Sequence, residues 1–438
     1  MIPPFMQVDR VFTKATQTLC FAAHANAKAN IHAGPHSNTA PKRTDEMYCR
    51  TFARILPNAP FCNFAAICLS PAPHHAQIAI LTKGQTKIEE EKGLMIRFNN
   101  DYNRSCHPAI LKALEQSWSE SYDGYGLDTW CERASELIKQ HLNCDNAQIH
   151  FVVGGTQANY VGIDFMLRPW EGVICADTGH INVHETGAVE HIGRKCLPLP
   201  NENGKITAAQ IDEAATLYEE SDIPEHMITP RMVYISQSTE LGTLYSKEEL
   251  FAIHDACAKH NLYLFLDGAR LGYALAATNG SLTLADIAHV ADMFTIGGTK
   301  CGALFGEAIV ITNPVLQRNY RSAMKQNGAM LAKGWLLGIQ FATLFEDNLY
   351  FKITEQAIDQ ALRIRDAFAE KGIVQFVESP TNQQFFILTD AHMRALEQDF
   401  VFMFDHAEGP DQNVCRFCTS WANTNEEIDA LVNAIAQL

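Results

Sequence analysis

The sequence predicts an α/β fold, with a large domain built on a mostly parallel sheet and a smaller α+β domain after it. From Met95 onward, short apolar runs alternate with helical patterns, which is typical of βα units around a parallel sheet. Polar residues follow several runs directly, and open α/β sheets hold their sites at the carboxyl ends of strands. After about residue 345 the pattern changes to a long amphipathic helix and short strands.

The apolar runs of the large domain define its strands. Two helices between them have recognisable starts, because Ser246 with Glu249 and Thr207 with Gln210 have the spacing of a capping box. The first of these boxes precedes a helix expected over residues 250–260. The expected strands cover residues 148–153, 172–175, 232–236, 262–267, 293–296 and 307–311.

The chain is divided into three segments by these patterns. Residues 1–94 are predicted to lie outside the fold, residues 95–344 to form the large domain, and residues 345–438 the small one. The small domain is expected to contain a helix over 355–371, strands over 384–388 and 414–421, and a last helix that Thr424 and Glu427 cap.

The first segment has a basic composition. Residues 1–84 hold eight lysines and arginines against three acidic residues, a net charge of +5, and show no sustained periodicity. Such a segment is a targeting leader, an unstructured extension, or sequence upstream of a true start at Met95. These three alternatives stay open.

Composition narrows the class of protein. The 438 residues are 47% apolar and 19% charged, and no run reaches the roughly 18 apolar residues of a membrane span. The net charge of −16 argues against nucleic acid and anionic membrane as main partners. Thirteen cysteines without paired spacing indicate reduced thiols and a cytoplasmic location, and Cys415 and Cys418 are interpreted as strand residues of a small core.

Two strand ends carry the most specific chemistry. The run Leu-Tyr-Leu-Phe-Leu ends in Asp267-Gly-Ala-Arg270, and the run Met-Phe-Thr-Ile ends in Gly-Gly-Thr-Lys300. An acid that can hold a protonated pyridine nitrogen, near a lysine that can form a Schiff base, is the minimum equipment for pyridoxal phosphate chemistry. The alternative is two ordinary strands with a solvated Asp and Lys at their ends.

Further polar residues fit the same hypothesis. Gly154-Gly155-Thr156 opens a helix after a strand, where backbone N–H groups and the helix dipole favour an anion. His180 follows the strand over 172–175 and either stacks on a planar ring, moves a proton or is a satisfied polar residue. Arg416, in the middle of a strand, suits either an amino-acid carboxylate or a structural Asp. No pattern of metal ligands is present in the sequence.

Taken in order, these motifs resemble the low-specificity L-threonine aldolases. The shared order is Gly-Gly-Thr-Gln-Ala-Asn, a histidine, Ser-Thr-Glu, Asp-Gly-Ala-Arg and Gly-Gly-Thr-Lys, together with Arg97-Phe-Asn-Asn-Asp-Tyr, Gly124-Tyr-Gly and Lys325-Gln-Asn-Gly. The resemblance covers about residues 95–438. It implies the aspartate aminotransferase-like fold of the fold-type I pyridoxal phosphate enzymes, and a homodimer or homotetramer with sites shared between subunits.

The resemblance also implies roles for particular residues. Lys300 is the Schiff-base lysine, Asp267 the partner of the pyridine nitrogen, and His180 the residue that stacks on the ring. Contacts with the cofactor are implied for Gly155, Thr156, His180, Asp267, Arg270, Lys300 and Lys333. Contacts with the substrate are implied for Asn100, Tyr125 and Arg416, with Tyr125 and Lys333 reaching the neighbouring subunit's site.

The implied reaction is the aldol cleavage of threonine, allo-threonine and similar β-hydroxy amino acids to glycine and acetaldehyde. The group that accepts the hydroxyl proton is left open among His180, Glu240 and a bound water. Glu240 stands where some members of the family have a histidine, and Leu127 replaces an acid that often follows Tyr-Gly. Other reactions of the same cofactor, such as β-elimination or transamination, and a non-catalytic binding protein are the alternatives.

Overall fold

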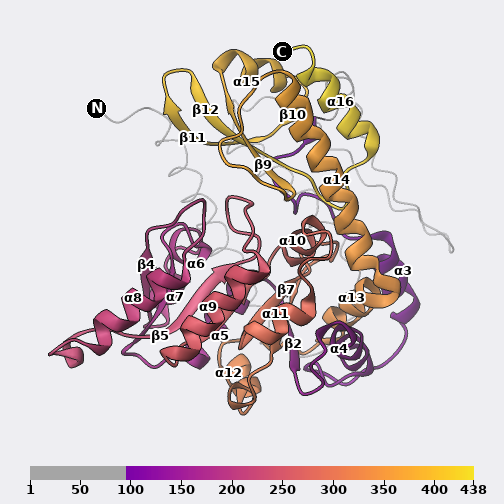
Figure 1. The fold of residues 1–438 in the computed structure, drawn as a ribbon. Helices are drawn as coiled ribbons and strands as arrows, with labels where there is room; N and C mark the ends of the chain where they lie inside the picture. The colour runs from indigo at the N-terminus through magenta and orange to yellow at the C-terminus, as the bar shows by residue number, and fades with distance from the viewer. Residues whose placement is uncertain (1–94) are drawn as a thin grey trace, which may run out of the picture. The chain divides into compact units, whose positions relative to one another are not determined.

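A seven-stranded sheet forms the centre of the computed structural model, which describes residues 95–438 (Figure 1). The strand order is β2-β8-β7-β6-β5-β3-β4. Strand β8 pairs antiparallel with β7 and β2, and the other pairings are parallel, which confirms the predicted sheet. The strands are β2 (Gln148–Val152), β3 (Glu171–Ala176), β4 (Lys195–Leu199), β5 (Thr229–Ser236), β6 (Tyr263–Asp267), β7 (Met293–Gly297) and β8 (Glu307–Ile311).

Helices cover both faces of this sheet, so its strands are apolar on both sides. On β5, Val233 and Ile235 pack into one core cluster, while Met232 and Tyr234 pack into the other. Helices α4, α8, α9, α10, α11 and α13 contribute to the first cluster, and α5, α6, α7 and α12 to the second. Both faces are therefore buried, as the continuous apolar runs predicted.

The capping boxes predicted at Thr207 and Ser246 are both present, and helices begin one residue after each. The helices of this part are α3 (Pro108–Ser117), α4 (Thr129–Leu142), α5 (Gly155–Met166), α6 (His180–Val183), α7 (Ala188–His191), α8 (Ala208–Glu219), α9 (Lys247–Lys259), α10 (Leu271–Ala277), α11 (Leu284–Val290), α12 (Tyr320–Gln326) and α13 (Trp335–Phe345).

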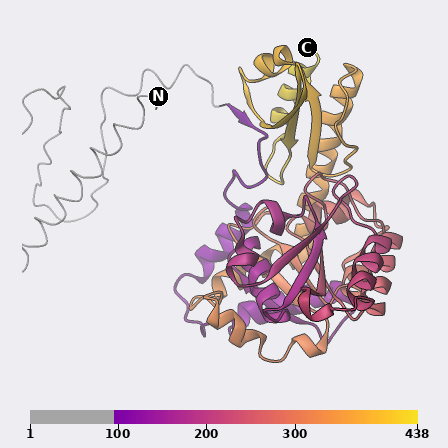
Figure 2. The same cartoon turned by 90° about the vertical axis from the view of Figure 1, so that its left-hand side faces the viewer.

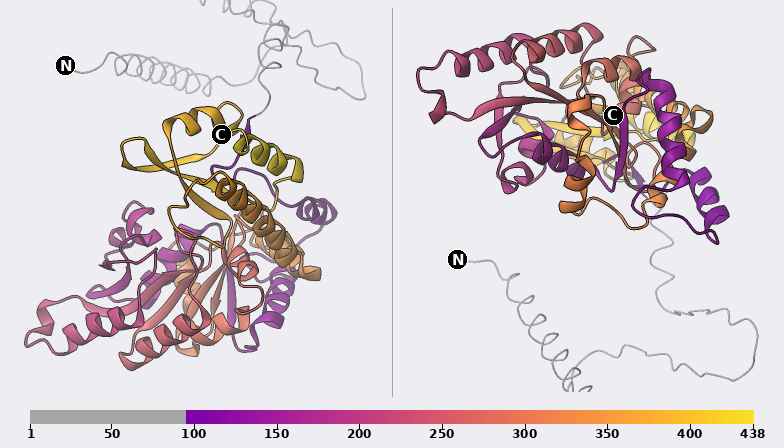
Figure 3. Two further views of the ribbon diagram at one scale, coloured as in Figure 1. Left: turned by 45° about the horizontal axis from the view of Figure 1, so that its top comes forward. Right: turned by 90° about the horizontal axis from the view of Figure 1, so that it is seen from below.

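The long helix α14 (Leu349–Glu370) leads into a smaller α+β part, which Figure 2 shows in gold and yellow beside the large sheet. Its antiparallel sheet has the order β11-β12-β9, and α14 and α16 pack together beside it, as the left view of Figure 3 shows. Its other elements are β9 (Gln383–Leu388), α15 (Asp390–Leu396), β10 (Phe400–Val401), β11 (Met403–Gly409), β12 (Gln412–Cys418) and α16 (Asn425–Ile435).

The first described residues lie beside this smaller part. Strand β1 (Ile96–Arg97) pairs with β10, and Phe98 is buried in one core cluster with Phe368 and Phe386. The cluster also contains Cys415, in agreement with the interpretation of Cys415 and Cys418 as strand residues of a small core. The chain thus passes from the smaller part into the large domain just before Asp101.

Two further predictions concern residues 1–94 and membrane-spanning segments. Those made for residues 1–94 lie outside the described residues. Between residues 95 and 438, no helix combines the length and the apolar character that crossing a bilayer requires.

Candidate active site

Asp267 ends β6, where three donors of the same subunit surround its buried carboxylate. Its Oδ2 accepts hydrogen bonds from the Tyr234 hydroxyl at 2.5 Å and from Asn159 Nδ2 at 2.9 Å, and its Oδ1 accepts one from the backbone N–H of Ala269 at 2.8 Å. Burial alone would raise the pKa of Asp267. The charge of His180 and these hydrogen bonds outweigh burial and lower the pKa, so this carboxylate is charged at neutral pH.

Lys300 follows β7 in a loop that runs so close to neighbouring backbone that two of its positions have to be glycine. A Cβ on Gly297 would lie 2.1 Å from the carbonyl oxygen of Ala269, and one on Gly298 would lie 2.6 Å from that of Gly306. The backbone oxygen of Lys300 accepts a hydrogen bond from the Tyr273 hydroxyl at 2.7 Å. Burial and the charge of Arg270 lower the pKa of Lys300 in spite of nearby acids, which favours a neutral, nucleophilic amine.

His180 opens the short helix α6 after β3, and Glu185 fixes its ring. The Glu185 carboxylate lies 2.9 Å from His180 Nδ1 and accepts a hydrogen bond from Asn159 Nδ2 at 2.8 Å. Burial disfavours a charged His180 ring, but the hydrogen bond to Glu185 and the charges of Asp267 and Glu185 raise its pKa. Because Asn159 also bonds Asp267, one polar network joins the histidine to the aspartate.

Glu240 supports His180 from the backbone side. Its Oε1 accepts hydrogen bonds from the Ser236 hydroxyl at 2.7 Å and from the backbone N–H of His180 at 2.9 Å. Burial raises the pKa of Glu240. This carboxyl therefore holds the start of α6, and the same oxygen has little capacity left for a third partner.

The N-terminus of α5 provides an open cradle. Gly154 is the N-cap, and no side chain of residues 95–438 caps the helix there. Cβ atoms placed on Gly154 or Gly155 would meet nothing within 4 Å, and Thr156 is exposed beside them. Free N–H groups at a helix start, with open space before them, suit a phosphate group.

Arg270 acts on Lys300 through its charge and is held by Asp101. Its Nε and Nη2 donate to the two carboxylate oxygens of Asp101 at 2.7 and 3.1 Å, and Asn382 Nδ2 donates to the same carboxylate at 2.9 Å. The Nη1 of Arg270 has no hydrogen bond to the part of the chain that the structure describes. Three segments far apart in sequence thus meet beside Lys300.

Arg416, on β12, faces the site from the smaller part of the chain. It donates to the side-chain oxygen of Gln383 and to the backbone oxygen of Asn99, each at 3.2 Å, and its Nη2 lies 3.0 Å from the Met403 sulfur. Its Nε is buried without a hydrogen bond, and none of the described acids lies within ion-pair distance of it. Asn100, predicted beside it, accepts a hydrogen bond from the backbone N–H of Tyr102 at 3.1 Å.

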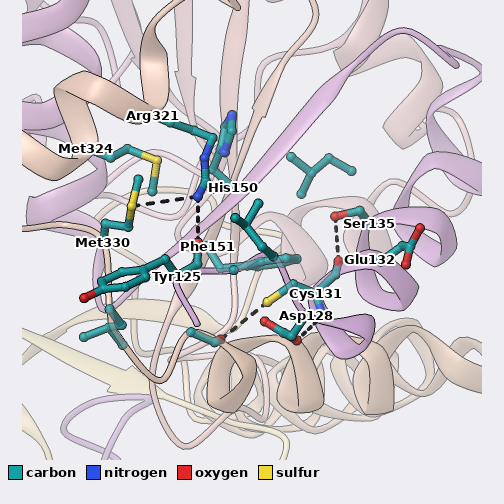
Figure 4. A pocket seen from close by; sticks show the side chains of 15 residues that line it. Tyr125, Asp128, Cys131, Glu132, Ser135, His150, Phe151, Arg321, Met324 and Met330 are labelled. Atoms are coloured by element: carbon teal, nitrogen blue, oxygen red, sulfur yellow. Dashed lines mark hydrogen bonds between the residues drawn. The ribbon is translucent and has the colours of Figure 1, made fainter. Parts of the chain in front are cut away.

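Tyr125 and Lys333 lie apart from this cluster, and both are exposed. The Lys325 amine lies 4.5 Å from the centre of the Tyr125 ring, and Arg321 donates to the Tyr125 backbone oxygen at 2.9 Å. Figure 4 shows Tyr125 at the edge of a cavity of about 320 Å³, with Arg321 beside it and Cys131 further along the wall. Among the described residues, neither Tyr125 nor Lys333 forms a hydrogen bond or an ion pair with the side chains around Lys300.

Comparison with known proteins adds to this geometry. The model of the beta-eliminating lyase family matches residues 108–407. The low specificity L-threonine aldolase of Pseudomonas aeruginosa is 29% identical over 341 residues, which cover 77% of this chain and 96% of that protein. A Leishmania major threonine aldolase structure has 42% identity and a TM-score of 0.76, over 78% of this chain and 99% of that one.

The chain belongs to the beta-eliminating lyase family, among its threonine aldolases. A double mutant of the Thermus thermophilus aspartate aminotransferase, at 12% identity with a TM-score of 0.58 over 80% of this chain and 94% of that one, shares the fold alone. These findings confirm the resemblance and the fold that the motifs implied.

The described residues fit the pyridoxal phosphate that this family uses. The cradle before α5 has room for its phosphate, because Cβ positions on Gly154 and Gly155 are open. The partly buried amine of Lys300 is suited to a covalent link, since its pKa is lowered. The charged carboxylate of Asp267 is suited to a protonated ring nitrogen.

Two carboxyl groups of this aldolase site were missed by sequence reasoning. The sequence patterns assign no role to Glu185, and they place Glu307 only as the first residue of a strand. Glu307 is buried, accepts a hydrogen bond from the backbone N–H of Gly298 at 3.1 Å, and burial raises its pKa to about 7. The one available signal was a charged residue at the start of the apolar run Glu-Ala-Ile-Val-Ile.

Proposed function

We propose that this chain cleaves L-threonine, L-allo-threonine and similar β-hydroxy amino acids to glycine and acetaldehyde, with pyridoxal phosphate as its cofactor. One observation carries the proposal: a lysine with a lowered pKa lies in the same buried cluster as a charged aspartate at the neighbouring strand end. The chain's membership of the threonine aldolases supports the reaction class.

When bound, pyridoxal phosphate withdraws electrons from the α-carbon of an amino acid, which lets a bond at that carbon break. The protein's part is to position and to hold protons. Asp267 would hold a proton on the ring nitrogen, since its own three hydrogen bonds keep it charged and in place. His180, fixed by Glu185, would stack on the ring, and Lys300 would supply the amine.

The amino acid's carboxylate is assigned to Arg416 and Asn100. Arg416 has a buried Nε without a hydrogen bond and no described acid within ion-pair distance. An arginine in that state favours an anionic ligand over the alternative of a structural Asp. Arg270 is assigned to the cofactor's ring oxygen through its Nη1, because Asp101 already takes its Nε and Nη2.

Tyr125 and Lys333 are assigned to the site of a neighbouring subunit, in a homodimer or homotetramer. Their exposure, without a hydrogen bond to the described side chains around Lys300, supports this assignment. The nine cysteines that the structure describes are free thiols, which supports a reducing compartment such as the cytoplasm.

Product analysis tests the proposal. The protein is incubated with pyridoxal phosphate and, in separate reactions, with L-threonine, L-serine, and an amino acid plus a keto acid. Glycine and acetaldehyde from threonine are expected. Pyruvate and ammonia from serine would indicate β-elimination, exchange of the amino group would indicate transamination, and no product in any reaction would indicate a non-catalytic binding protein.

The Lys300→Ala variant tests the assignment of the lysine. It should keep its melting temperature within a few degrees, lose the visible absorbance of covalently bound cofactor, and form no acetaldehyde. Lys112→Ala, which removes an exposed lysine on α3, is the matched control and should keep the absorbance. Full absorbance and cleavage in Lys300→Ala would refute the assignment.

A further inference from the structure

A second histidine, His184, lies beside His180 at the exposed side of the site. It follows helix α6 directly, and its backbone N–H donates to the His180 backbone oxygen at 2.9 Å. The centres of the two imidazole rings are 5.5 Å apart. His184 is exposed, whereas the side chain of His180 is about one-third exposed.

Charged groups from both parts of the chain face His184. The charges of His180 and Arg270 act on it from the large domain, and those of Arg416 and Asp405 act on it from the smaller part. Partial burial and the positive charges of His180, Arg416 and Arg270 lower the pKa of His184, and Asp405 opposes them. Its imidazole is therefore neutral at pH 7 and can accept a proton.

The two side chains named above as possible proton acceptors, His180 and Glu240, each have one polar atom engaged with the protein. His180 lies against Glu185 through its Nδ1, and its raised pKa makes it a weaker acceptor at neutral pH. The Oε1 of Glu240 accepts hydrogen bonds from the Ser236 hydroxyl and from the His180 backbone N–H. Among the described residues around the ring, His184 is the neutral base with an exposed side chain.

The position of His184 also suits a contact with the substrate's β-carbon and its hydroxyl group. An amino acid whose amine lies near Lys300 and whose carboxylate lies at Arg416 has two of its groups fixed. Its β-carbon is the group left for another part of the site to contact, and the His184 ring lies 5.5 Å from that of His180. The charge of Arg416 contributes to lowering the pKa of His184, so the two side chains lie within electrostatic range of each other.

We propose that the imidazole of His184 is a catalytic residue that accepts the proton of the substrate's β-hydroxyl group. This inference rests on the proposed aldol cleavage. The O–H bond breaks and its proton passes to the imidazole, while the O–H electron pair forms the aldehyde's C=O double bond. The Cα–Cβ electron pair stays with Cα, which takes up one proton to become the CH₂ group of glycine. The imidazolium gives up one proton in return, so no proton is gained or lost overall.

His184→Phe and His184→Asn test the role, with His226→Phe as the matched control. His226 is an exposed histidine before β5, at the opposite end of the strands from the site. General base catalysis contributes about 10²- to 10⁴-fold to a rate, so both His184 variants should lose about that much in kcat for threonine. The control should match the wild type.

Glycine separates this role from a structural one, because glycine has no β-hydroxyl group. Its affinity, measured by titrating the cofactor's absorbance, should change by less than about 2-fold in the His184 variants, and their melting temperatures should stay unchanged. The acid side of the wild type's kcat–pH profile, where protonation of His184 lowers the rate, should be absent in both variants.

Three results would overturn the inference. A kcat for threonine within about 3-fold of the wild type, with the acid side of the pH profile intact, would exclude His184 as the base. A matching loss of glycine affinity would show that His184 holds the site's structure instead. A wild type that binds glycine but cleaves no β-hydroxy amino acid would remove the proposed function itself, and this inference with it.

Discussion

Asp267 and Arg416 face the candidate site from its two sides. The protein supplies hydrogen-bond partners to Asp267 more completely than to Arg416. Asp267 receives three hydrogen bonds from Tyr234, Asn159 and Ala269, all within the large domain. Arg416 has two long hydrogen bonds to oxygens, a contact with sulfur, and a buried Nε without a hydrogen bond. The side proposed for the cofactor is thus preorganised by the fold, whereas the side proposed for the substrate keeps unused hydrogen-bonding capacity.

This difference has a chemical reason. A cofactor that stays bound through many turnovers benefits from a rigid, charged environment that costs no reorganisation at the moment of reaction. A substrate must enter and leave, so the group that binds it cannot be fully paired with the protein. Substitutions on the two sides should therefore change different quantities, kcat for the cofactor side and substrate affinity for the substrate side.

Asp267→Asn should have the largest effect and should act on the chemical step. Asparagine keeps the shape of the side chain but removes the charge that holds a proton on the ring nitrogen. Removing a preorganised electrostatic contact typically costs about 10²- to 10³-fold in kcat, so a loss of that size is expected in threonine cleavage. The affinity for glycine should fall much less than kcat.

Asp292→Asn is the matched control for this variant. The Asp292 carboxylate lies at the other end of the same sheet, where it accepts hydrogen bonds from the Leu264 backbone and from Asn313 at 2.8 and 2.7 Å. Its loss should lower the melting temperature and spare kcat. Equal kcat losses in both variants would mean that Asp267 acts through fold stability and not on the cofactor.

Arg416→Ala should have a smaller effect, on binding. A hydrogen-bonded charge pair contributes about 1.5–3 kcal/mol, so the affinity for threonine should fall about 10- to 100-fold while the cofactor stays bound. Arg363→Ala, which removes an exposed pair with Asp429 from the smaller part of the chain, is the control and should bind threonine normally. Unchanged affinity with a lowered melting temperature would make Arg416 a structural residue.

Much of the fold and part of this contrast could be predicted from the sequence. Strand ends are local features, because an apolar run followed by Asp267 or by two glycines and Lys300 can be recognised within a few residues. The same holds for the capping boxes, which the structure reproduces at Thr207 and Ser246. The mostly parallel sheet followed from the alternation of such segments.

The polar network was not predicted, because its members meet only in three dimensions. Asn159 lies 108 positions from Asp267, and its own sequence context is that of any polar residue near the start of a helix. Glu185 lies next to an exposed histidine and has no local sign of burial. Asp101 and Arg270, separated by 169 positions, likewise show no pairing signal in one sequence.

Glu307→Gln should have the smallest effect on activity and a pH-dependent effect on stability. The pKa of Glu307 is about 7 in the folded protein, above its ordinary value of 4.5, because burial disfavours the charge. The carboxyl group's contribution to stability is therefore fully present below pH 4.5 and is lost as pH rises through 7. The shift corresponds to about 3 kcal/mol.

Glutamine can still accept the hydrogen bond from Gly298 but carries no charge, so it avoids this loss. The melting temperature of Glu307→Gln, measured with the cofactor bound, should exceed that of the wild type by a few degrees at pH 8 and match it near pH 5. Glu136→Gln, which changes an exposed carboxylate on α4, should follow the wild type at both pH values. A Glu307 variant that is less stable at pH 8 would show that the charged carboxylate is a favourable partner of Lys300, and would place Glu307 with Asp267 among the groups that the cofactor side requires.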